Sequence, residues 1–149
     1  MEIRRGDILT EGQGLIFIPV NMVGILGAGL AKQWAQIADQ ESIVDYKKAC
    51  TSRRIVNETI VTDKYVLFPT KGHWREKSKW SDIASRLRDT FEDLESMLDA
   101  ADRRLCYSVS IPKLGFGLGG LDWQTYMPVM VNLLLDLEET TDLGVTLFV

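Results

Sequence analysis

The sequence predicts an α/β protein, a three-layer α/β/α sandwich whose central sheet is mixed but mainly parallel. Three observations lead to this class. Short apolar runs that suit buried strands alternate with longer stretches of helical periodicity. Two of these runs, Leu15–Val20 and Leu105–Ile111, each lead into a glycine-rich loop and then into a helix. The 149 residues match the size of one domain with a substantial core, so residues 1–149 are expected to form a single domain.

The first third of the chain is expected to hold two strands and two helices. Met1–Thr10 suits a short strand, followed by a turn around Glu11–Gly14. Leu15–Val20 is a continuous apolar run, which is typical of a strand buried on both faces. Helices are expected over Ala28–Ala38 and Ser42–Cys50. Their inward side chains are predicted from the spacing to be Leu30, Trp34 and Ile37 in the first, and Ile43, Tyr46 and Cys50 in the second.

The rest of the chain continues the alternation. Thr59–Pro69 is rich in β-branched and aromatic residues, with Asp63-Lys64 as its hairpin turn. A long helix is expected over Ser81–Ala100 and a strand over Leu105–Ile111. A helix over Trp123–Glu138 and a strand over Val145–Val149 complete the chain. The helices are expected to bury Ile83, Leu87, Phe91, Leu94 and Leu98, and Tyr126, Met127, Met130, Leu134 and Leu137.

The composition is that of a soluble globular protein, with 46% hydrophobic and 26% charged residues. A net charge of −4 argues against a broad, non-specific grip on nucleic acid, but allows one anionic ligand in a local cradle. Cys50 and Cys106 are too few and too far apart for a disulfide scaffold, which favours the cytoplasm. The N-terminus lacks a signal-peptide core, and no run is long enough to span a membrane. No cluster of potential ligands has metal-binding spacing, so no metal is expected.

Two glycine-rich loops follow predicted strands and precede predicted helices. The first contains Gly24, Gly27 and Gly29, and the second spans Gly115–Gly120. A strand, a glycine loop and a helix together direct backbone N–H groups at an anion. Neither loop matches the two common nucleotide fingerprints, and a plain turn is the alternative for each. Because ligands of such sheets bind at the carboxyl ends of the strands, both loops are expected to line one crevice, where a facing pair suits a diphosphate bridging two sugars.

These motifs resemble those of the macrodomain family, whose members bind ADP-ribose in an α/β/α fold. The matching residues, in the order of the family, are Gly6-Asp7-Ile8, Pro19-Val20-Asn21, Gly27-Ala28-Gly29, Ile111-Pro112 and residues 115–121. Two further stretches are sharper: Phe68-Pro69-Thr70-Lys71-Gly72-His73-Trp74-Arg75 followed by Ser78, and Gly119-Gly120-Leu121-Asp122-Trp123. They resemble the antitoxin macrodomains that remove ADP-ribose from thymidine in DNA, and related phage and bacterial proteins. That branch is akin to the terminal ADP-ribose protein glycohydrolases.

The resemblance implies roles for individual residues in binding ADP-ribose. Asp7 would accept a hydrogen bond from the adenine amino group beside the Ile8 backbone; ordering the turn after the first strand is the alternative. Asn21 would bind the distal ribose, unless its amide satisfies its own turn. The remaining contacts would come from two backbone segments: Gly27, Ala28 and Gly29 at the distal phosphate and ribose, and Gly115, Phe116, Gly117, Leu118 and Gly119 around the diphosphate.

Lys71 is the candidate catalytic residue. In the similar glycohydrolases, a lysine at this position is thought to attack the anomeric carbon of the distal ribose. Partial desolvation lowers the pKa of an amine and makes it available as a nucleophile or base. Neutralising a ligand phosphate, or lying solvated in a loop, is the alternative. His73, the only histidine, is a candidate proton donor to the leaving base or a residue that orders a turn, and Asn21 completes the candidate catalytic set.

Other residues near Lys71 have simpler expected roles. Trp74 is a candidate for stacking on a sugar or base, with core packing the simpler expectation for one of four tryptophans. Arg75 and Lys77 are candidates for a phosphate at the mouth, or a solvated edge. Either Ser78 or Ser81 is expected to cap the long helix, and Asp122 is expected to cap the helix that follows it.

Three functions follow from the resemblance: a hydrolase that removes ADP-ribose from nucleic acid through Lys71, a phosphatase acting on ADP-ribose 1″-phosphate, and a non-catalytic reader. The protein-type glycohydrolases have an aspartate where this chain has Gly119, whereas the DNA-type branch has glycine, which favours a nucleic-acid adduct. A monomer without a cofactor is expected, as is little affinity for unmodified DNA. The candidate cations of a local basic rim are Lys64, Lys71, Arg75, Lys77 and Lys79.

Overall fold

A computed structural model describes residues 1–100 and 108–149 of the chain. The N-terminal half contains β1 (Glu2–Arg4), α1 (Ile8–Glu11), β2 (Leu15–Asn21), α2 (Gly29–Ile37), α3 (Gln40–Thr51), α4 (Arg54–Asn57), β3 (Ile60–Thr62) and β4 (Tyr65–Lys71). The C-terminal half contains α5 (Trp80–Ala100), β5 (Ser108–Ile111), α6 (Trp123–Thr140) and β6 (Gly144–Phe148).

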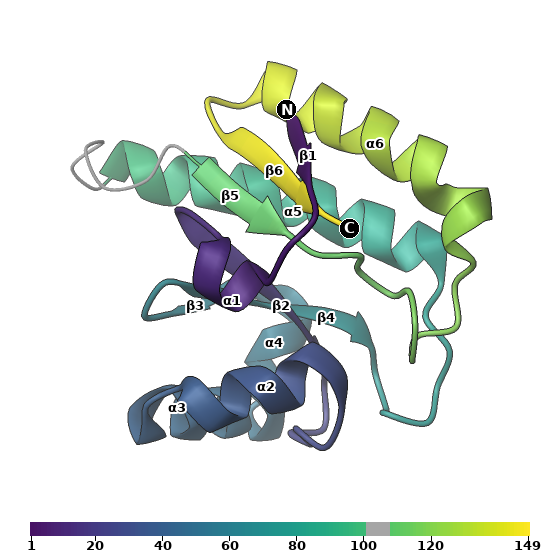
Figure 1. The fold of residues 1–149 in the computed structure, drawn as a ribbon. Helices are drawn as coiled ribbons and strands as arrows, with labels where there is room; N and C mark the ends of the chain where they lie inside the picture. The colour runs from purple at the N-terminus through teal and green to yellow at the C-terminus, as the bar shows by residue number, and fades with distance from the viewer. Residues whose placement is uncertain (101–107) are drawn as a thin grey trace.

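The strands form one six-stranded sheet in the order β1-β6-β5-β2-β4-β3. All neighbouring pairs are parallel except β3 and β4, which form an antiparallel hairpin. Helices α5 and α6 cover one face of the sheet, and α2, α3 and α4 lie on the other (Figure 1). The predicted three-layer sandwich with a mixed, mainly parallel sheet is therefore confirmed.

The central strands explain why the core has two halves. In β2, Ile16, Ile18 and Val20 pack with the α1–α4 side, whereas Phe17 packs with α5 and α6. Alternate side chains of a strand point to opposite faces, so a strand covered on both sides must be apolar throughout. The continuous apolar run that predicted this strand is the direct consequence.

Several expected details of the helices are wrong. The segment Met1–Thr10 was expected to be a short strand, but β1 ends at Arg4 and α1 begins at Ile8; the turn expected around Glu11–Gly14 follows that helix at residues 12–14. The short helix α4 has no counterpart among the predicted elements. Ile37 and Met127 were expected to face inward but are exposed, since each lies beyond the arc of its helix that the sheet covers. The structure does not describe the side chain of Leu98 or residues 105–107. The expected burial of Leu98 and the first part of the strand expected over Leu105–Ile111 therefore lie outside the described residues.

The predicted cap of α6 is confirmed, because the Asp122 carboxylate accepts a hydrogen bond from Thr125 N at 3.1 Å. The predicted cap of α5 is wrong. Ser81 lies inside the helix, and the buried Ser78 Oγ has no hydrogen-bond partner among the residues that the structure describes. The main-chain N–H of Ser78 instead donates to Gly119 O at 2.8 Å. Ser78 therefore joins the start of α5 to the second glycine loop rather than capping the helix.

Candidate functional site

Both glycine-rich loops line one cavity of about 910 Å³ at the carboxyl ends of the parallel strands. Asn21 and Lys71 end β2 and β4, Pro112 follows β5, and Phe148 ends β6. The residues predicted as site residues that line it are Ile8, Asn21, Gly27, Ala28, Gly29, Lys71, Gly115, Phe116, Leu118 and Gly119. Asp7, His73 and Gly117 are not among the lining residues. The expectation that both loops share one crevice is confirmed.

Asn21 is nearly buried and organises the first loop. Its Oδ1 accepts hydrogen bonds from Val23 N and Gly24 N, each at 3.1 Å, and its Nδ2 donates to Ile25 O at 2.8 Å. The Tyr46 hydroxyl donates to the main-chain oxygen of Asn21 at 2.9 Å and lies 3.1 Å from its Oδ1. The side chain thus satisfies its own turn, and one hydrogen of Nδ2 has no recorded partner within the described residues.

The N-terminus of α2 opens onto the cavity. Ala28 occupies the N-cap position without a side-chain hydrogen bond, and Ala28, Gly29, Leu30 and Ala31 all line the cavity. The first N–H groups of a helix have no partner within the helix, and the helix dipole places partial positive charge there. This end of the cavity therefore offers main-chain donors to an anion.

The second loop is built on close backbone approaches. Gly115 has φ +82°, which favours glycine, and a Cβ at this position would overlap Ile83 Cδ1. At Gly119 a Cβ would overlap Gly115 O and lie 2.6 Å from Ser78 Oγ. Because main chain blocks the space, a larger residue at Gly119 requires the loop to move. The loop therefore packs against the start of α5 and presents Phe116 and Leu118 to the cavity.

Lys71 connects the two sides of the cavity. It is the last residue of β4, and its Nζ donates to Leu118 O in the second loop at 3.4 Å. The next residue, Gly72, accepts a hydrogen bond from Met22 N of the first loop at 2.8 Å. Within the described residues no ion pair with Lys71 is recorded. The amine is thus held at the cavity without a carboxylate partner.

His73 orders the turn that follows Lys71. Its Nδ1 accepts a hydrogen bond from Arg75 N at 3.1 Å, and its ring stacks on Trp74 with centroids 5.2 Å apart. The turn-ordering alternative for this histidine is therefore present in the structure, and its role as a proton donor stays a prediction. Trp74 and Arg75 line the cavity, whereas Lys77 does not.

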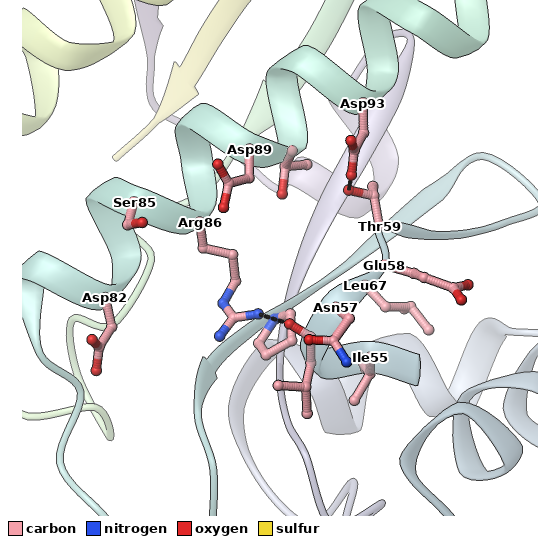
Figure 2. Close-up of a pocket in the computed structure, with 13 residues that line it drawn as sticks. Ile55, Asn57, Glu58, Thr59, Leu67, Asp82, Ser85, Arg86, Asp89 and Asp93 are labelled. Atoms are coloured by element: carbon pink, nitrogen blue, oxygen red, sulfur yellow. Dashed lines mark hydrogen bonds between the residues drawn. The ribbon is translucent and has the colours of Figure 1, made fainter. Parts of the chain in front are cut away.

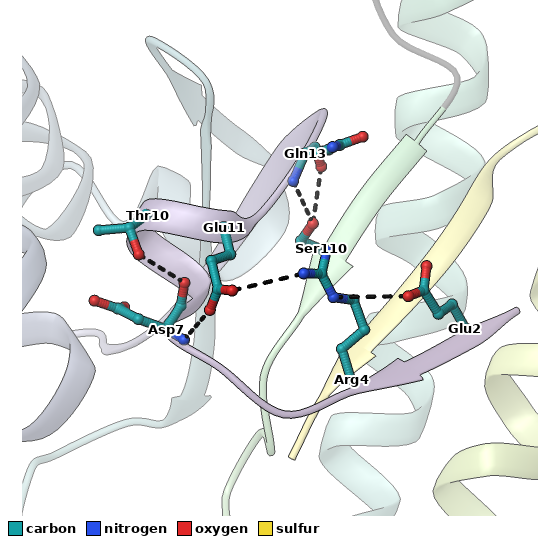
Figure 3. A network of polar contacts seen from close by, with 7 residues as sticks. All are labelled: Glu2, Arg4, Asp7, Thr10, Glu11, Gln13 and Ser110. Atoms are coloured by element: carbon teal, nitrogen blue, oxygen red, sulfur yellow. Dashed lines mark hydrogen bonds and ion pairs between the residues drawn. The ribbon is translucent and has the colours of Figure 1, made fainter.

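Asp7 lies just outside the cavity, in an adjoining groove of about 670 Å³ that shares Gly6, Ile8 and Leu30 with it. Its carboxylate accepts a hydrogen bond from Leu9 N at 3.0 Å and caps α1. Its own N–H donates to the Glu11 carboxylate at 2.7 Å, and Arg4 lies 3.6 Å from that carboxylate (Figure 3). The turn-ordering alternative is thus observed for Asp7, and adenine recognition stays a prediction.

Several lining residues were not predicted. Val20 and Thr70 directly adjoin the predicted site residues Asn21 and Lys71, and Ile25 lies within the first glycine loop. Phe148 ends the last strand and Val149 follows it, at the same edge of the sheet. The rule that ligands bind at strand carboxyl ends contained the signal for this last pair. Tyr46 was predicted only as a core residue, but its hydroxyl also donates a hydrogen bond to the main-chain oxygen of Asn21.

A second, smaller cavity of about 190 Å³ lies between α4 and α5, away from the glycine loops (Figure 2). Arg86 reaches into it and donates to Val56 O at 3.4 Å. Burial lowers the pKa of Arg86, while Asp82 and Asp89 oppose that shift. In the described residues there is no group of three or more His, Cys, Asp or Glu arranged to hold a metal ion, and no helix long and apolar enough to cross a membrane.

No protein-family model matches the chain. Its sequence is 34% identical over 128 residues to a DNA ADP-ribosyl glycohydrolase of Mycobacterium tuberculosis, covering 80% of this chain and 34% of the relative. The chain thus spans about a third of that relative's length. Among solved structures, the macrodomain of Mycobacterium tuberculosis DarG has a TM-score of 0.76 and 27% identity, covering 99% of this chain and 95% of that one.

A third similarity is to Thermosipho africanus DarTG in complex with ADP-ribose, with a TM-score of 0.76 and 26% identity over 98% of this chain and 40% of that one. The chain therefore has the macrodomain fold. Among macrodomains, its sequence is similar to the DarG macrodomains and to DNA ADP-ribosyl glycohydrolases. The resemblance drawn from the sequence is confirmed.

Proposed function

We propose that this chain binds ADP-ribose in the large cavity and hydrolyses ADP-ribosyl groups attached to nucleic acid, of the thymidine type. The observation that carries the proposal is the convergence of two glycine loops on one cavity, with the Lys71 amine at their junction. The similar proteins, DNA ADP-ribosyl glycohydrolases and DarTG with bound ADP-ribose, support the same class of substrate.

The lining residues suggest how ADP-ribose is distributed. The Ile8 end would take the adenine, with Asp7 at the adjoining groove. The diphosphate would lie between the open N-terminus of α2 and the second loop, where main-chain N–H groups are available. The distal ribose would then lie beside Asn21 and Lys71. Since Asn21 Oδ1 already accepts several hydrogen bonds, its contribution to a ribose hydroxyl would be the remaining N–H of Nδ2.

In the proposed reaction, Nζ of Lys71 attacks the anomeric carbon of the distal ribose with its electron pair. A bond forms between Nζ and that carbon while the bond to the base breaks, and the base leaves with its electron pair and takes up a proton. Water then attacks the same carbon, and the lysine departs with the electron pair of its bond. The products are ADP-ribose, the unmodified base and a regenerated amine.

Gly119 supports a nucleic-acid adduct over a protein adduct. The protein-type glycohydrolases have an aspartate at the corresponding position. Here a Cβ at Gly119 would overlap Gly115 O, and Gly119 O is fixed by Ser78 N. An aspartate therefore does not fit this loop without rearrangement, and the carboxylate that assists the protein-type reaction is missing.

The test is to incubate the protein with ADP-ribose linked to thymidine in DNA, to guanosine and to glutamate, and to follow release of ADP-ribose by chromatography. We expect the thymidine adduct to be consumed fastest. Consumption of the glutamate adduct alone would contradict the proposal. Binding of ADP-ribose without cleavage of any adduct would identify a reader, and phosphate release from ADP-ribose 1″-phosphate would identify a phosphatase.

A further inference from the structure

Trp74 differs from the other tryptophans of the chain. Trp34 is fully buried, and Trp80 and Trp123 pack against the core formed with α5 and α6. The Trp74 side chain, in contrast, is 45% exposed, and it lines the large cavity. Exposing a large aromatic ring loses the stabilisation that burial would give. The expectation of core packing is therefore wrong for this residue, and its exposure requires another explanation.

Trp74 is held in a stack of planar groups. His73 stacks on it at 5.2 Å with an interplanar angle of 29°, and the Arg75 guanidinium carbon lies 4.6 Å from the Trp74 ring centroid. The hydrogen bond from Arg75 N to His73 Nδ1 fixes the turn that brings the three side chains together. Stacking orients the guanidinium before any ligand arrives, which reduces the entropy lost on binding.

The stack lies on the rim at the Lys71 end of the cavity. Trp74 and Arg75 follow Lys71 by three and four residues, and all three line the cavity. The cavity is also lined by an exposed apolar side chain from each glycine loop, Ile25 and Leu118, the latter 70% exposed. In the proposed function, a group attached to the distal ribose leaves the cavity at this end.

The charge of this segment is opposite to that of the whole chain. Residues 71–79 contain four cationic side chains and one carboxylate, Glu76, in a chain of net charge −4. Nucleobases stack on aromatic rings and on guanidinium planes, and arginine also pairs with phosphate. A rim that combines stacked planar groups with a local positive charge thus matches a nucleic-acid strand, which offers bases to stack and phosphates to pair.

We infer that Trp74 and Arg75 form a platform for the strand that carries the ADP-ribosyl group: a nucleobase next to the modified one stacks on the platform, and Arg75 contacts the adjoining phosphate. The inference rests on the proposed function. It makes the protein selective for an adduct within a single strand over the same adduct on a free nucleoside. The platform contacts only about one base beyond the adduct, so it is compatible with the expectation of little affinity for unmodified DNA.

The experiment compares KM for ADP-ribosylated thymidine as a nucleoside and within a single-stranded oligonucleotide of about ten nucleotides. We expect a KM about tenfold lower for the oligonucleotide with the wild-type protein. Trp74→Ala should lose most of this preference, Trp74→Phe should keep most of it, and turnover numbers should change far less than KM. Thermal unfolding of each variant verifies the fold, which is not at risk because Trp74 is not a core residue.

A second readout isolates the phosphate contact. The log affinity for the ADP-ribosylated oligonucleotide falls with log salt concentration. For Arg75→Gln, the slope of this line should be less steep by about 0.7. Arg88→Gln removes the same charge from an exposed position on α5 and should leave both the preference and the slope unchanged. Equal effects of the two arginine variants would overturn the phosphate contact.

The outcomes separate this inference from the proposed function. If the wild-type protein cleaves both substrates with equal KM, the proposed function stands and the platform is overturned. The platform is also overturned if Trp74→Ala keeps the preference for the oligonucleotide. Preference for an ADP-ribosylated peptide over the oligonucleotide would assign the rim to protein substrates instead. If neither substrate is cleaved, the proposed function fails. The platform is then tested by comparing the Kd of the ADP-ribosylated oligonucleotide with the Kd of free ADP-ribose. Equal Kd values for the wild-type protein would overturn the platform.

Discussion

The Nζ of Lys71 lies 3.4 Å from the main-chain oxygen of Leu118, so a side chain at the end of β4 reaches the second glycine loop across the cavity. The two residues are 47 positions apart in the sequence. Because Gly72 also accepts a hydrogen bond from Met22 of the first loop, the end of β4 joins both loops. The Lys71 amine therefore lies where the two loops come together.

The first prediction concerns Lys71. Lys71→Ala should lower the rate of ADP-ribose release from modified DNA by about a hundredfold or more, because the nucleophile is lost. ADP-ribose itself should still bind, which isothermal titration calorimetry measures. Lys71→Arg keeps the positive charge but not the nucleophile and should be as inactive as the alanine variant. Undiminished turnover in either variant would remove Lys71 from the mechanism.

A second prediction tests the close packing of the second loop. Gly119→Ala should destabilise the protein by about 1–3 kcal/mol, because the added methyl group overlaps the Gly115 main chain. Gly27→Ala is the matched control: its Cβ would lie 3.6 Å from Ile25 Cγ2, an ordinary contact. Urea denaturation measures both. Equal stability of the two variants would show that the loop moves freely to accept a side chain.

Tyr46 supplies the third prediction. Burial raises the pKa of Tyr46 above its ordinary value of 10.0, so its hydroxyl remains protonated and donates to Asn21. Tyr46→Phe should cost about 1–2 kcal/mol of unfolding free energy, because it leaves Asn21 O without this donor. Affinity for ADP-ribose should also fall, since the first loop loses support.

Tyr65→Phe is the control for this substitution, because Tyr65 is also buried but its hydroxyl has no recorded hydrogen bond among the described residues. Denaturation midpoints of the two variants give the comparison. A Tyr65→Phe variant as unstable as Tyr46→Phe would indicate loss of packing rather than loss of the Asn21 contact.

The fourth prediction concerns acid stability. Hydrogen bonds from the Ser42 N–H to Asp39, and from the Thr125 hydroxyl and N–H to Asp122, hold the pKa of both carboxyls below the ordinary value of 3.8. The unfolded chain therefore binds these protons more readily than the folded one. Their stabilisation is complete above the ordinary pKa and is lost as the pH falls through the lower, folded value.

Asparagine caps a helix about as well as aspartate but does not titrate in this range. The double variant Asp39→Asn, Asp122→Asn should therefore lose less stability between pH 6 and pH 2 than the wild-type protein. Thermal unfolding across that range measures the difference. An identical pH dependence in both proteins would show that the two caps contribute nothing to acid sensitivity.

Local sequence patterns predicted the structure correctly wherever a residue's environment depends on its neighbours in the chain. The apolar run of β2 predicted a strand buried on both faces, and the spacing of Ile83, Leu87, Phe91 and Leu94 predicted the buried face of α5. Asp122 was recognisable as a cap from its position before a helix. The order of the motifs predicted the macrodomain fold, and the position of both loops at strand carboxyl ends predicted their shared cavity.

Other features depend on contacts between distant parts of the chain. The exposure of Ile37 and Met127 depends on how far the sheet extends beneath each helix, which helical spacing does not encode. The engagement of Asn21 by Tyr46 and the exposure of Trp74 likewise follow from packing. The same holds for Phe148, which reaches the cavity because β6 pairs between β1 and β5.

The sequence by itself therefore determined the fold class and the sheet-edge position of the site, because strand alternation, glycine loops and helix periodicity act over a few residues. The candidate residues came from the resemblance of its motifs to those of macrodomains. Only the tertiary structure decided which of those residues face the cavity. In that structure Lys71 contacts Leu118, Asp7 and His73 order turns, and Trp74 lies exposed at the cavity. Side-chain direction and hydrogen-bond partners are set by long-range packing, where a group's nearest neighbours are remote in the chain.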